Sequence, residues 1–407
     1  MTERSEGIDE RRMTYDPWSP DFVADPYAAY AELRRDRPVY FDEPTGQWVV
    51  SRHEDVNALL RDRRLGRTYL HVASHEEFGR PPEPEFLAPF WNLIRAGMLD
   101  VEPPDHTRLR RLVSKAFTPR MVEGLRARIR ELAAELARGL AERGGGDLLA
   151  EVAEPLPVTV IAEMLGIPAV DHPLLRPWSA QICGMYELEP PDETQRTAVR
   201  ASVEFSEYLR DLARTRRAAP GEDLISALTA VEGLTEDELV GTCVLLLNAG
   251  HEATVNATGN SWWALLRNPD QLDRLRADHG LVPTAVEELL RYDTPAPMFE
   301  RWVLEDIEVA GVRVPRGAEV ALQFASANHD PDVFAEPGTL DLARDPNPHI
   351  GFGAGIHFCL GAPLARIELA ESMGALLRAA PDLRLKTEPK WKPGFILRGL
   401  ESLHVEV

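Results

Sequence analysis

The chain has 407 residues, with 45 Lys and Arg against 66 Asp and Glu and a formal net charge of -21 at pH 7. This acidity excludes DNA or RNA as the main ligand, because phosphate binding relies on clustered Lys and Arg. The three cysteines lie far apart without a C-x-x-C pair, which excludes a disulfide framework and a zinc site and indicates a reducing cytoplasm.

The N-terminal segment is charged and lacks an apolar stretch, so we expect neither a signal peptide nor a membrane anchor. Residues 1 to about 15 are expected to form a short flexible extension. No internal repeat and no linker interrupts the rest of the chain. Residues 1–407 are therefore expected to form a single domain.

The first hundred residues predict a helix, a hairpin and a loop in turn. Tyr27 to Asp36 has an amphipathic helical pattern, and Val39 to Ser51 reads as a hairpin in which two apolar runs flank a turn. Helix resumes near Glu54. The stretch from Thr68 to Gly97 is rich in Pro, Gly and aromatic residues, which indicates an ordered loop over a pocket.

The remainder predicts helices around one long central helix. Met121 to Arg143 is a helical pattern that ends at three glycines, and another runs from Pro283 to Tyr292. Thr235 to Leu266 has no internal proline and is far longer than the average helix of about 11 residues. Its middle is apolar on nearly every side, which is typical of a helix that crosses a core. The predicted fold class is therefore mainly α with small β-sheets.

One cysteine has unusual surroundings. The decapeptide Phe352 to Gly361, F-G-A-G-I-H-F-C-L-G, places Cys359 between glycines just before a predicted helix. A thiolate that ligates a metal needs shelter and backbone N–H donors aimed at its sulfur. Leu360 to Pro363 can supply these donors, because the first amides of a helix have no internal partner. Glycines such as Gly353 allow a flat cofactor to approach closely. The alternative is a buried structural cysteine in a Gly-rich turn.

The long helix carries a second constellation. Ala249 and Gly250 remove side-chain bulk in mid-helix, and the glycine costs about 1 kcal/mol relative to alanine, which indicates close approach of a flat group or a local distortion. Glu252 follows among apolar residues, so it should be paired, protonated or reached by water. A plain salt bridge or a solvated edge is the alternative.

Two further pairs of polar residues lie one turn apart on predicted helices. Glu288 and Arg291 are an acid and a base at i, i+3, a spacing that proves nothing alone, because exposed pairs contribute well under about 1 kcal/mol. His106 and Arg110 are at i, i+4 after two prolines, so both can grip one carboxylate. Taken alone, they would more often face solvent.

In this order, the segments from Glu102 to Gly361 resemble the motifs of the cytochrome P-450 superfamily, in particular its soluble bacterial members of actinobacterial type. The resemblance implies the cytochrome P-450 fold, with haem b between the long central helix and the cysteine loop. It implies that Cys359 ligates the haem iron. It places Glu288 and Arg291 in a structural network behind the haem. Further cofactor contacts are implied for Gly353, Ala249 and Gly250, and for four propionate-binding residues, His106, Arg110, Arg301 and His357.

The resemblance also implies catalytic roles on the long helix, with one departure. Glu252 matches the acid of the oxygen-activation motif, Ala/Gly-Gly-x-Asp/Glu-Thr, and would deliver protons for dioxygen activation. Ala253 occupies the place of the motif's threonine, and Thr254 lies about 100° further round the helix. Three explanations remain open. A substrate hydroxyl or an ordered water replaces the donor, a different side chain reaches in, or the reaction needs less help with O–O cleavage.

The implied function is that of a haem-dependent monooxygenase that activates O2. It would hydroxylate, epoxidise or oxidatively couple an apolar or aromatic small molecule, as in natural-product tailoring. No flavin or iron–sulfur segment is present, so we expect a separate ferredoxin and ferredoxin reductase to supply electrons. The alternatives are a haem-binding recruitment scaffold without turnover and a peroxide-driven oxidase.

The expected partners follow from the same resemblance. Arg108, Arg111, Lys115 and Arg366 would form a basic docking patch for an acidic ferredoxin, or they are merely solvated charges. We expect a monomer without nucleic-acid or membrane partners.

The resemblance places a substrate pocket over the haem. Its walls would be the loop from Leu70 to Leu99, the segment from Ile182 to Leu188, and residues of three further elements. These residues are Leu247, Ala249, Ala253, Pro297, Met298, Phe299, Phe395, Ile396 and Leu397. Such an apolar and aromatic lining favours an apolar or aromatic-bearing substrate.

Overall fold

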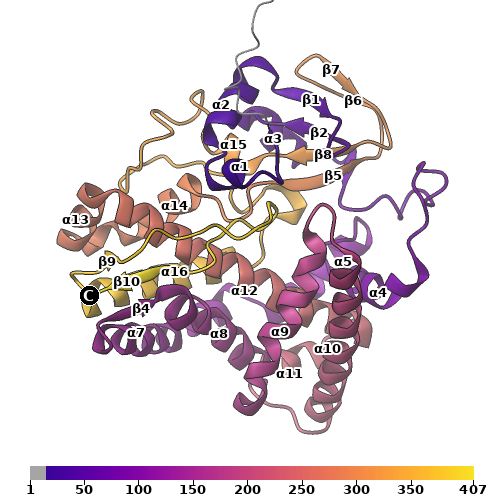
Figure 1. The fold of residues 1–407 in the computed structure, drawn as a ribbon. Coiled ribbons are helices and arrows are strands. Elements are labelled where there is room, and N and C mark those ends of the chain that lie inside the picture. The colour runs from indigo at the N-terminus through magenta and orange to yellow at the C-terminus, as the bar shows by residue number, and fades with distance from the viewer. Residues whose placement is uncertain (1–14) are drawn as a thin grey trace, which may run out of the picture.

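The computed structural model describes residues 15–407, and helices make up most of this range, as the sequence predicts (Figure 1). The expectation of a flexible extension falls on residues before Tyr15, outside the described range. Among residues 15–407, no helix combines the length and the apolar character needed to cross a membrane.

The main β-sheet gathers strands from distant parts of the chain and lies at the top of Figure 1. Its order is β1-β2-β8-β5-β3, in which β2 and β8 are parallel and the other neighbours are antiparallel. The β1–β2 hairpin confirms the prediction for Val39 to Ser51. The strands are β1 Val39–Asp42, β2 Gln47–Val50, β3 Leu65–Gly66, β5 Phe299–Val303 and β8 Glu319–Leu322.

Two smaller sheets and an isolated antiparallel bridge between Trp391 and Leu400 make up the other β-structure of the described residues. The order β4-β10-β9 forms one, and the β6–β7 hairpin forms the other. Their strands are β4 Gly145–Asp147, β6 Ile307–Val309, β7 Val312–Val314, β9 Arg384–Leu385 and β10 His404–Glu406.

Helix occurs within the segment expected to be a loop, Thr68 to Gly97. The 3-10 turn η1 (Glu85–Leu87) leads into α4 (Ala88–Ala96), which buries Phe90 and Leu93 on one face. This apolar face, together with a proline in the first turn of α4, explains the helix. The other helices of the N-terminal region are α1 Pro20–Ala24, α2 Tyr27–Asp36, α3 His53–Leu59 and α5 Asp105–Ala116.

The single helix predicted over Met121 to Arg143 is two helices, α6 (Pro119–Gly124) and α7 (Arg126–Glu142). At their junction the amide of Leu125 donates to the carbonyl of Val122, a tighter i to i−3 bond that interrupts the α-helical pattern. A glycine, the poorest helix former after proline, ends α6. The prediction was therefore wrong about continuity and right about helix.

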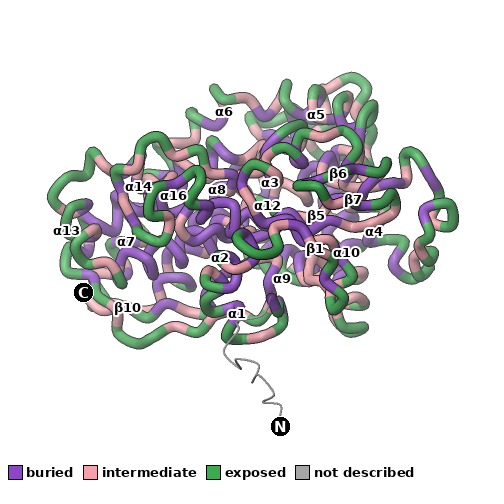
Figure 2. Tube along the Cα trace, turned by 90° about the horizontal axis from the view of Figure 1, so that it is seen from above, coloured by how far each residue is buried: buried purple, intermediate pink, exposed green. Residues whose placement is uncertain are grey.

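The central helix α12 (Glu236–Arg267) matches its prediction. Thr235 accepts from the amide of Glu238, and the Glu238 side chain accepts from the amide of Thr235, so a capping box fixes its start. In Figure 2 its path through the middle of the molecule is largely purple, the colour of buried residues. It packs against α4, α8, α9 and α16, and so crosses the core.

The remaining helices surround α12 or connect it to the sheets. The α-helices are α8 Pro155–Leu165, α9 His172–Cys183, α10 Asp192–Ala218, α11 Leu224–Thr229, α13 Pro269–Ala277, α14 Val282–Tyr292, α15 Phe324–Ala327 and α16 Ala362–Ala379. The shorter turns are η2 Leu149–Ala153, η3 Ala169–Asp171, η4 Gly184–Tyr186, η5 His279–Leu281 and η6 Gly355–His357.

Candidate active site

Cys359 lies in the short connection between η6 and the start of α16. Its own amide donates to the carbonyl of Phe352 at 3.0 Å, which closes the loop. Burial raises the pKa of the Cys359 thiol, and hydrogen bonds from the amides of Gly361 and Ala362 act in the opposite direction. These are the helix-start donors that the sequence predicts. The loop therefore presents a sheltered sulfur that can carry negative charge.

Two features of this region require glycine: backbone conformations with positive φ, and neighbouring chain segments that leave no room for a Cβ. Gly353 and Gly355 have φ of 66° and 71°, a left-handed conformation that side chains rarely adopt. A Cβ on Gly355 would lie 2.3 Å from the carbonyl oxygen of Leu60. A Cβ on Gly250 in α12 would lie 2.6 Å from the end of the Ile161 side chain. Packing within the chain thus already explains Gly250 and Gly355.

A cavity of about 260 Å³ separates the cysteine loop from α12. One wall contains Phe352, Gly353 and Cys359, and the opposite wall contains residues of α12. These α12 residues are Ala249, Gly250, Ala253 and Thr254. The wall residues are mostly small or apolar, which suits a flat, largely apolar group between the helix and the sulfur.

Arg301 on β5 lines this cavity and is almost completely buried. Its Nη1 donates to the carbonyl of Glu300 at 2.8 Å, and no other hydrogen bond of its guanidinium is found among residues 15–407. Burial lowers the pKa of Arg301 to about 9. A buried guanidinium with several free donors is costly unless an anion meets it, so the site calls for a carboxylate here.

Two histidines lie together, and one of them, His357, lines the same cavity. The rings of His106 and His357 are 4.4 Å apart, and His357 Nε2 lies 3.0 Å from the Glu102 carboxylate. Both ring nitrogens of His106 are buried without a partner in the described part of the chain. Burial is the main cause that lowers the pKa of His106 to about 4. Such orphaned groups fit a cofactor that brings acceptors of its own.

Arg110 connects α5 to the cysteine loop. Its two terminal nitrogens donate to the carbonyls of Ile356 and Phe358 at 2.8 and 2.7 Å. It also lines the cavity beside Cys359. Three of the four predicted propionate-binding residues, Arg110, Arg301 and His357, thus line one cavity, and the fourth, His106, lies behind His357 against its ring. This donor set fits a haem with two carboxylates and an iron for the thiolate.

The predicted catalytic residues of α12 do not all face the cavities. Ala253 and Thr254 line the first cavity, whereas Glu252 lines neither cavity described here. The Glu252 carboxylate instead accepts from Lys392 Nζ at 2.7 Å, and the same ammonium lies 3.2 Å from Asn256 Oδ1. The sequence left pairing of this acid open, and the structure shows its partner.

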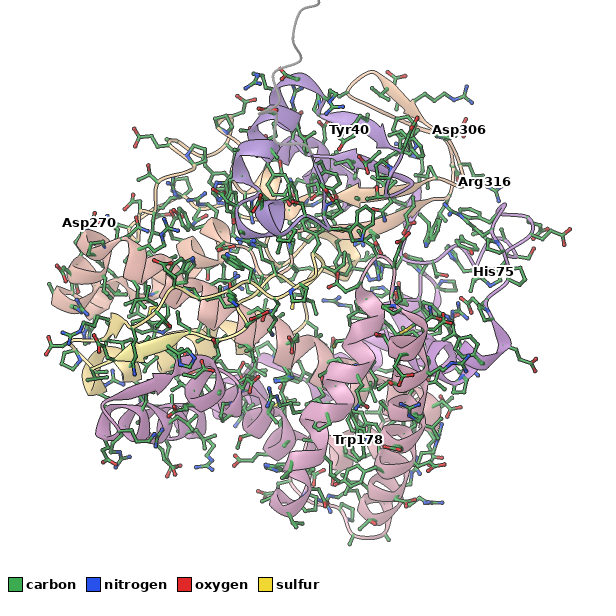
Figure 3. The ribbon with its side chains drawn as sticks, in the orientation of Figure 1. Tyr40, His75, Trp178, Asp270, Asp306 and Arg316 are labelled. Carbon is green, nitrogen blue, oxygen red and sulfur yellow. The ribbon has the colours of Figure 1, made fainter. Side chains whose placement is uncertain are left out.

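A second cavity, of about 520 Å³, adjoins the first and has Ala249, Ala253 and Phe299 in common with it. Met298, Ile396 and Leu397 also line it, as does His75 on the loop that projects at the right of Figure 3. Further walls come from Leu70 of the loop, from Trp91 on α4 and from the segment Met185 to Leu188, all within regions that the resemblance implies.

Three of the predicted pocket residues line neither cavity. Leu247 is fully buried in the helical core, because it lies on another face of α12. Phe395 packs against the rings of Tyr15 and Phe22. The carbonyl of Pro297 accepts from the amide of Ala325 in α15, so this residue holds its segment to that helix. Its neighbours on either side, Ala296 and Met298, line the second cavity instead.

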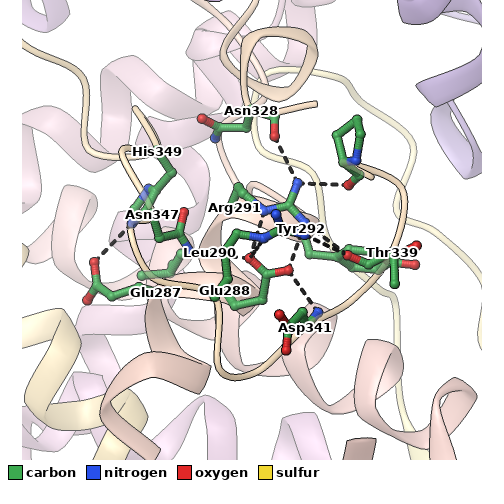
Figure 4. Close-up of polar contacts among 12 residues, drawn as sticks. Glu287, Glu288, Leu290, Arg291, Tyr292, Asn328, Thr339, Asp341, Asn347 and His349 are labelled. Carbon is green, nitrogen blue, oxygen red and sulfur yellow. Dashed lines mark hydrogen bonds and ion pairs between the residues drawn. The ribbon is translucent and has the colours of Figure 1, made fainter. Parts of the chain in front are cut away.

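Glu288 and Arg291 form a buried network on α14 (Figure 4). Both side chains are fully buried, and two hydrogen bonds of 2.7 and 2.8 Å join them. Arg291 also donates to the carbonyls of Asn328 and Pro337, and Glu288 accepts from the amide of Asp341. The pair therefore ties α14 to the long connection that precedes the cysteine loop.

Sequence reasoning missed Lys392 and Glu368. Lys392 is 140 positions from its partner Glu252, so no local pattern could reveal it. Glu368 lies on the buried face of α16, lines the first cavity and has an unpartnered Oε1 within the described chain. Burial raises the pKa of the Glu368 carboxyl to about 8. The apolar helical pattern around Glu368 was the available signal.

The comparisons with known proteins agree with this geometry. The family model for cytochrome P-450 matches residues 67–390. The chain is 42% identical to nocardicin C N-oxygenase from Nocardia uniformis subsp. tsuyamanensis, over 96% of this chain and 97% of that one. It is 37% identical to 6-deoxyerythronolide B hydroxylase from Saccharopolyspora erythraea, over 96% and 98%. The crystal structure of CalO2 superposes with a TM-score of 0.89 at 34% identity, over 97% of this chain and 98% of that one.

Proposed function

The chain belongs to the cytochrome P-450 family of monooxygenases, and from this premise we propose that it oxidises a small molecule held in the second cavity, with haem b held in the first. The observation that carries the proposal is the pair of adjoining cavities, with the Cys359 loop on one side and Ala253 at their junction. We further propose a tailoring role in natural-product metabolism, by analogy with the two named relatives.

The residues of the first cavity divide the work of holding the cofactor. Cys359 would ligate the iron, and the donors of Arg301, Arg110 and the two histidines would meet the carboxylates. Bound haem with a thiolate ligand supplies the chemistry that transfers one oxygen atom of O2 to the substrate. The amides of Gly361 and Ala362 stabilise negative charge on the sulfur, and the apolar walls exclude water from it.

Removal of the carboxylate-binding guanidiniums should weaken haem retention. We expect the double variant Arg110→Ala/Arg301→Ala to be purified with much less haem, because each charge-assisted hydrogen bond contributes about 1.5–3 kcal/mol. Haem transfer to apomyoglobin measures the rate of loss. Arg111→Ala on the same helix is the matched control, because that side chain is exposed. Equal haem content in both variants and the parent would contradict the assignment.

We propose proton delivery for Glu252, whose carboxylate accepts from Lys392 and whose neighbour in sequence, Ala253, lines both cavities. We expect Glu252→Gln to slow NADH consumption with a surrogate ferredoxin system by about 10²-fold, the lower end of what a positioned acid contributes. Ala253→Thr adds atoms where the cavities meet, and should divert reducing equivalents to peroxide. The rate of NADH consumption and the yield of hydrogen peroxide measure the two effects. If Ala253→Thr lowers peroxide release while Glu252→Gln leaves the rate unchanged, this route is absent.

Electrons would come from a separate ferredoxin and its reductase. The protein would act as a monomer in the cytoplasm. The docking patch is smaller than the sequence suggests, because Arg108 pairs with Glu238 and Arg366 pairs with Glu287. Arg111 and Lys115 remain exposed on α5.

The test of the proposed function is a ligand screen that follows shifts of the haem Soret band. Ligands that bind are then tested for turnover with a surrogate ferredoxin and reductase. A protein that binds haem and ligands but forms no product would favour the scaffold alternative.

A further inference from the structure

One part of the second cavity is unexpectedly rich in acceptors. Gln47 on β2, Glu300 on β5 and Glu319 on β8 all line it, together with Trp302. The cavity reaches from this group to Ala253, at the junction with the first cavity. An apolar substrate alone would leave this polar wall without a function.

The sheet places the three side chains on one face. Trp302 lies opposite Glu319 in the β5–β8 pair, and Glu300 lies two positions from Trp302, on the same side of its strand. The two carboxylates are therefore diagonal neighbours across adjacent strands, where like charges repel. Gln47 comes immediately before Trp48, which pairs with Val320. The fold thus creates the cluster, from segments more than 250 positions apart.

These acceptors outnumber the donors available to them. Gln47 Nε2 donates to Glu300 Oε1 at 3.1 Å. Gln47 is only 3% exposed, and its Oε1 has no hydrogen-bond partner in the described chain. Within residues 15–407 neither Glu300 nor Glu319 forms an ion pair. Burial raises the pKa of Glu319 to about 7, and the charge of Glu300 adds to this effect, whereas the nearby arginines and a hydrogen bond from Gln47 act in the opposite direction.

The cations around the cavity pair with other groups, although Nε of Arg67 has no hydrogen-bond partner in the described chain. Arg67 pairs with Asp100 at 3.0 Å, and Arg95 pairs with Glu83. Arg80 donates to a backbone carbonyl and lies 4.4 Å over the ring of Trp302. These arginines reduce the negative potential of the wall, but none of them forms an ion pair with Glu300 or Glu319.

We propose that Gln47, Glu300 and Glu319 bind a protonated amino group of the substrate, whose apolar body extends toward Ala253. An ammonium supplies both a positive charge and an N–H donor to this cluster, whose acceptors outnumber its own donors. This inference rests on the proposed function for the role of the bound molecule, and it narrows the substrate class to amine-bearing apolar compounds.

Three probes of equal chain length test the inference. They are N,N-dimethyldecylamine, decan-1-ol and decanoate. Each is titrated into the haem-loaded full chain, and isothermal titration calorimetry measures its affinity. We expect the amine to bind at least about tenfold more tightly than the alcohol, a difference of about 1.4 kcal/mol, with decanoate the weakest. Equal affinity for amine and alcohol would overturn the proposal.

Variants locate the effect. Glu300→Gln/Glu319→Gln should lower the affinity for the amine by about tenfold and leave decan-1-ol within about twofold. The substitution relieves like-charge repulsion, so the fold should persist, and haem content verifies this. Glu189→Gln is the matched control, because Glu189 lines the same cavity but is exposed. A loss of amine affinity in Glu189→Gln equal to that of the double variant would contradict the site.

Calorimetry separates this inference from the proposed function, because it reports binding whether or not oxygen is activated. Selective amine binding without turnover of any ligand would contradict the proposed function and support the site. Turnover of neutral ligands without preference for the amine would support the function and contradict the site.

Discussion

Cys359→Ala and Cys359→His should abolish the strongly red-shifted absorption band of the reduced carbon-monoxide complex. That band depends on a thiolate ligand, and Cys359 is the cysteine in the wall of the first cavity, where two helix-start amides point at its sulfur. Reduced-minus-oxidised spectra under carbon monoxide measure the effect directly. Turnover should fall with the band, because the thiolate promotes O–O cleavage.

The other cysteines provide the controls. Cys183 and Cys243 are buried, and burial raises the pKa of each thiol to about 12. Neither lines the first cavity. We therefore expect Cys183→Ala and Cys243→Ala to keep the band. If the band survives in Cys359→Ala or disappears in a control that retains haem, the ligand assignment is wrong.

Glu288→Ala should destabilise the folded protein more than any surface substitution. The carboxylate is fully buried against Arg291 and also accepts from Arg344 at 3.0 Å. Its removal leaves a buried guanidinium without its counterion, which costs about 3–5 kcal/mol in comparable sites. That cost is a large share of a typical unfolding free energy of about 5–15 kcal/mol. Urea unfolding of the haem-loaded protein measures the change.

Glu131→Ala is the matched control for this variant. Glu131 and Arg128 also form an i, i+3 pair, at 2.7 Å, but both side chains are largely exposed. Exposed pairs contribute under about 1 kcal/mol, so the control should change the unfolding free energy little. Equal effects of the two substitutions would show that burial of the Glu288 pair does not matter to the fold.

The sequence by itself determined the features that depend on neighbouring residues. The extent of α12 follows from the capping box at Thr235 and from an uninterrupted helical pattern. The position of Cys359 before a helix start was readable because glycine, cysteine and the first amides of α16 lie within ten residues. The spacing of His106 and Arg110 likewise predicted that they share one helix face.

The pocket residues mark the limit of that reasoning. Leu247 and Ala249 are two positions apart on α12, yet only Ala249 lines the cavities, because helical rotation turns the other into the core. Phe395 was expected in the pocket, whereas contacts with Tyr15 and Phe22 hold it in a separate aromatic cluster. Apolar character alone cannot distinguish a cavity wall from a core.

Only the tertiary structure decided which distant side chains meet. Lys392 reaches Glu252 across 140 positions, and the main sheet brings Gln47 to Glu300 across 253. Such contacts depend on strand register and helix packing, and no short stretch of sequence contains that information. The cysteine loop and the central helix could therefore be predicted residue by residue. The acidic wall of the second cavity arises only when β2, β5 and β8 form one sheet. The partner of Glu252 is set only when the C-terminal segment folds back against α12.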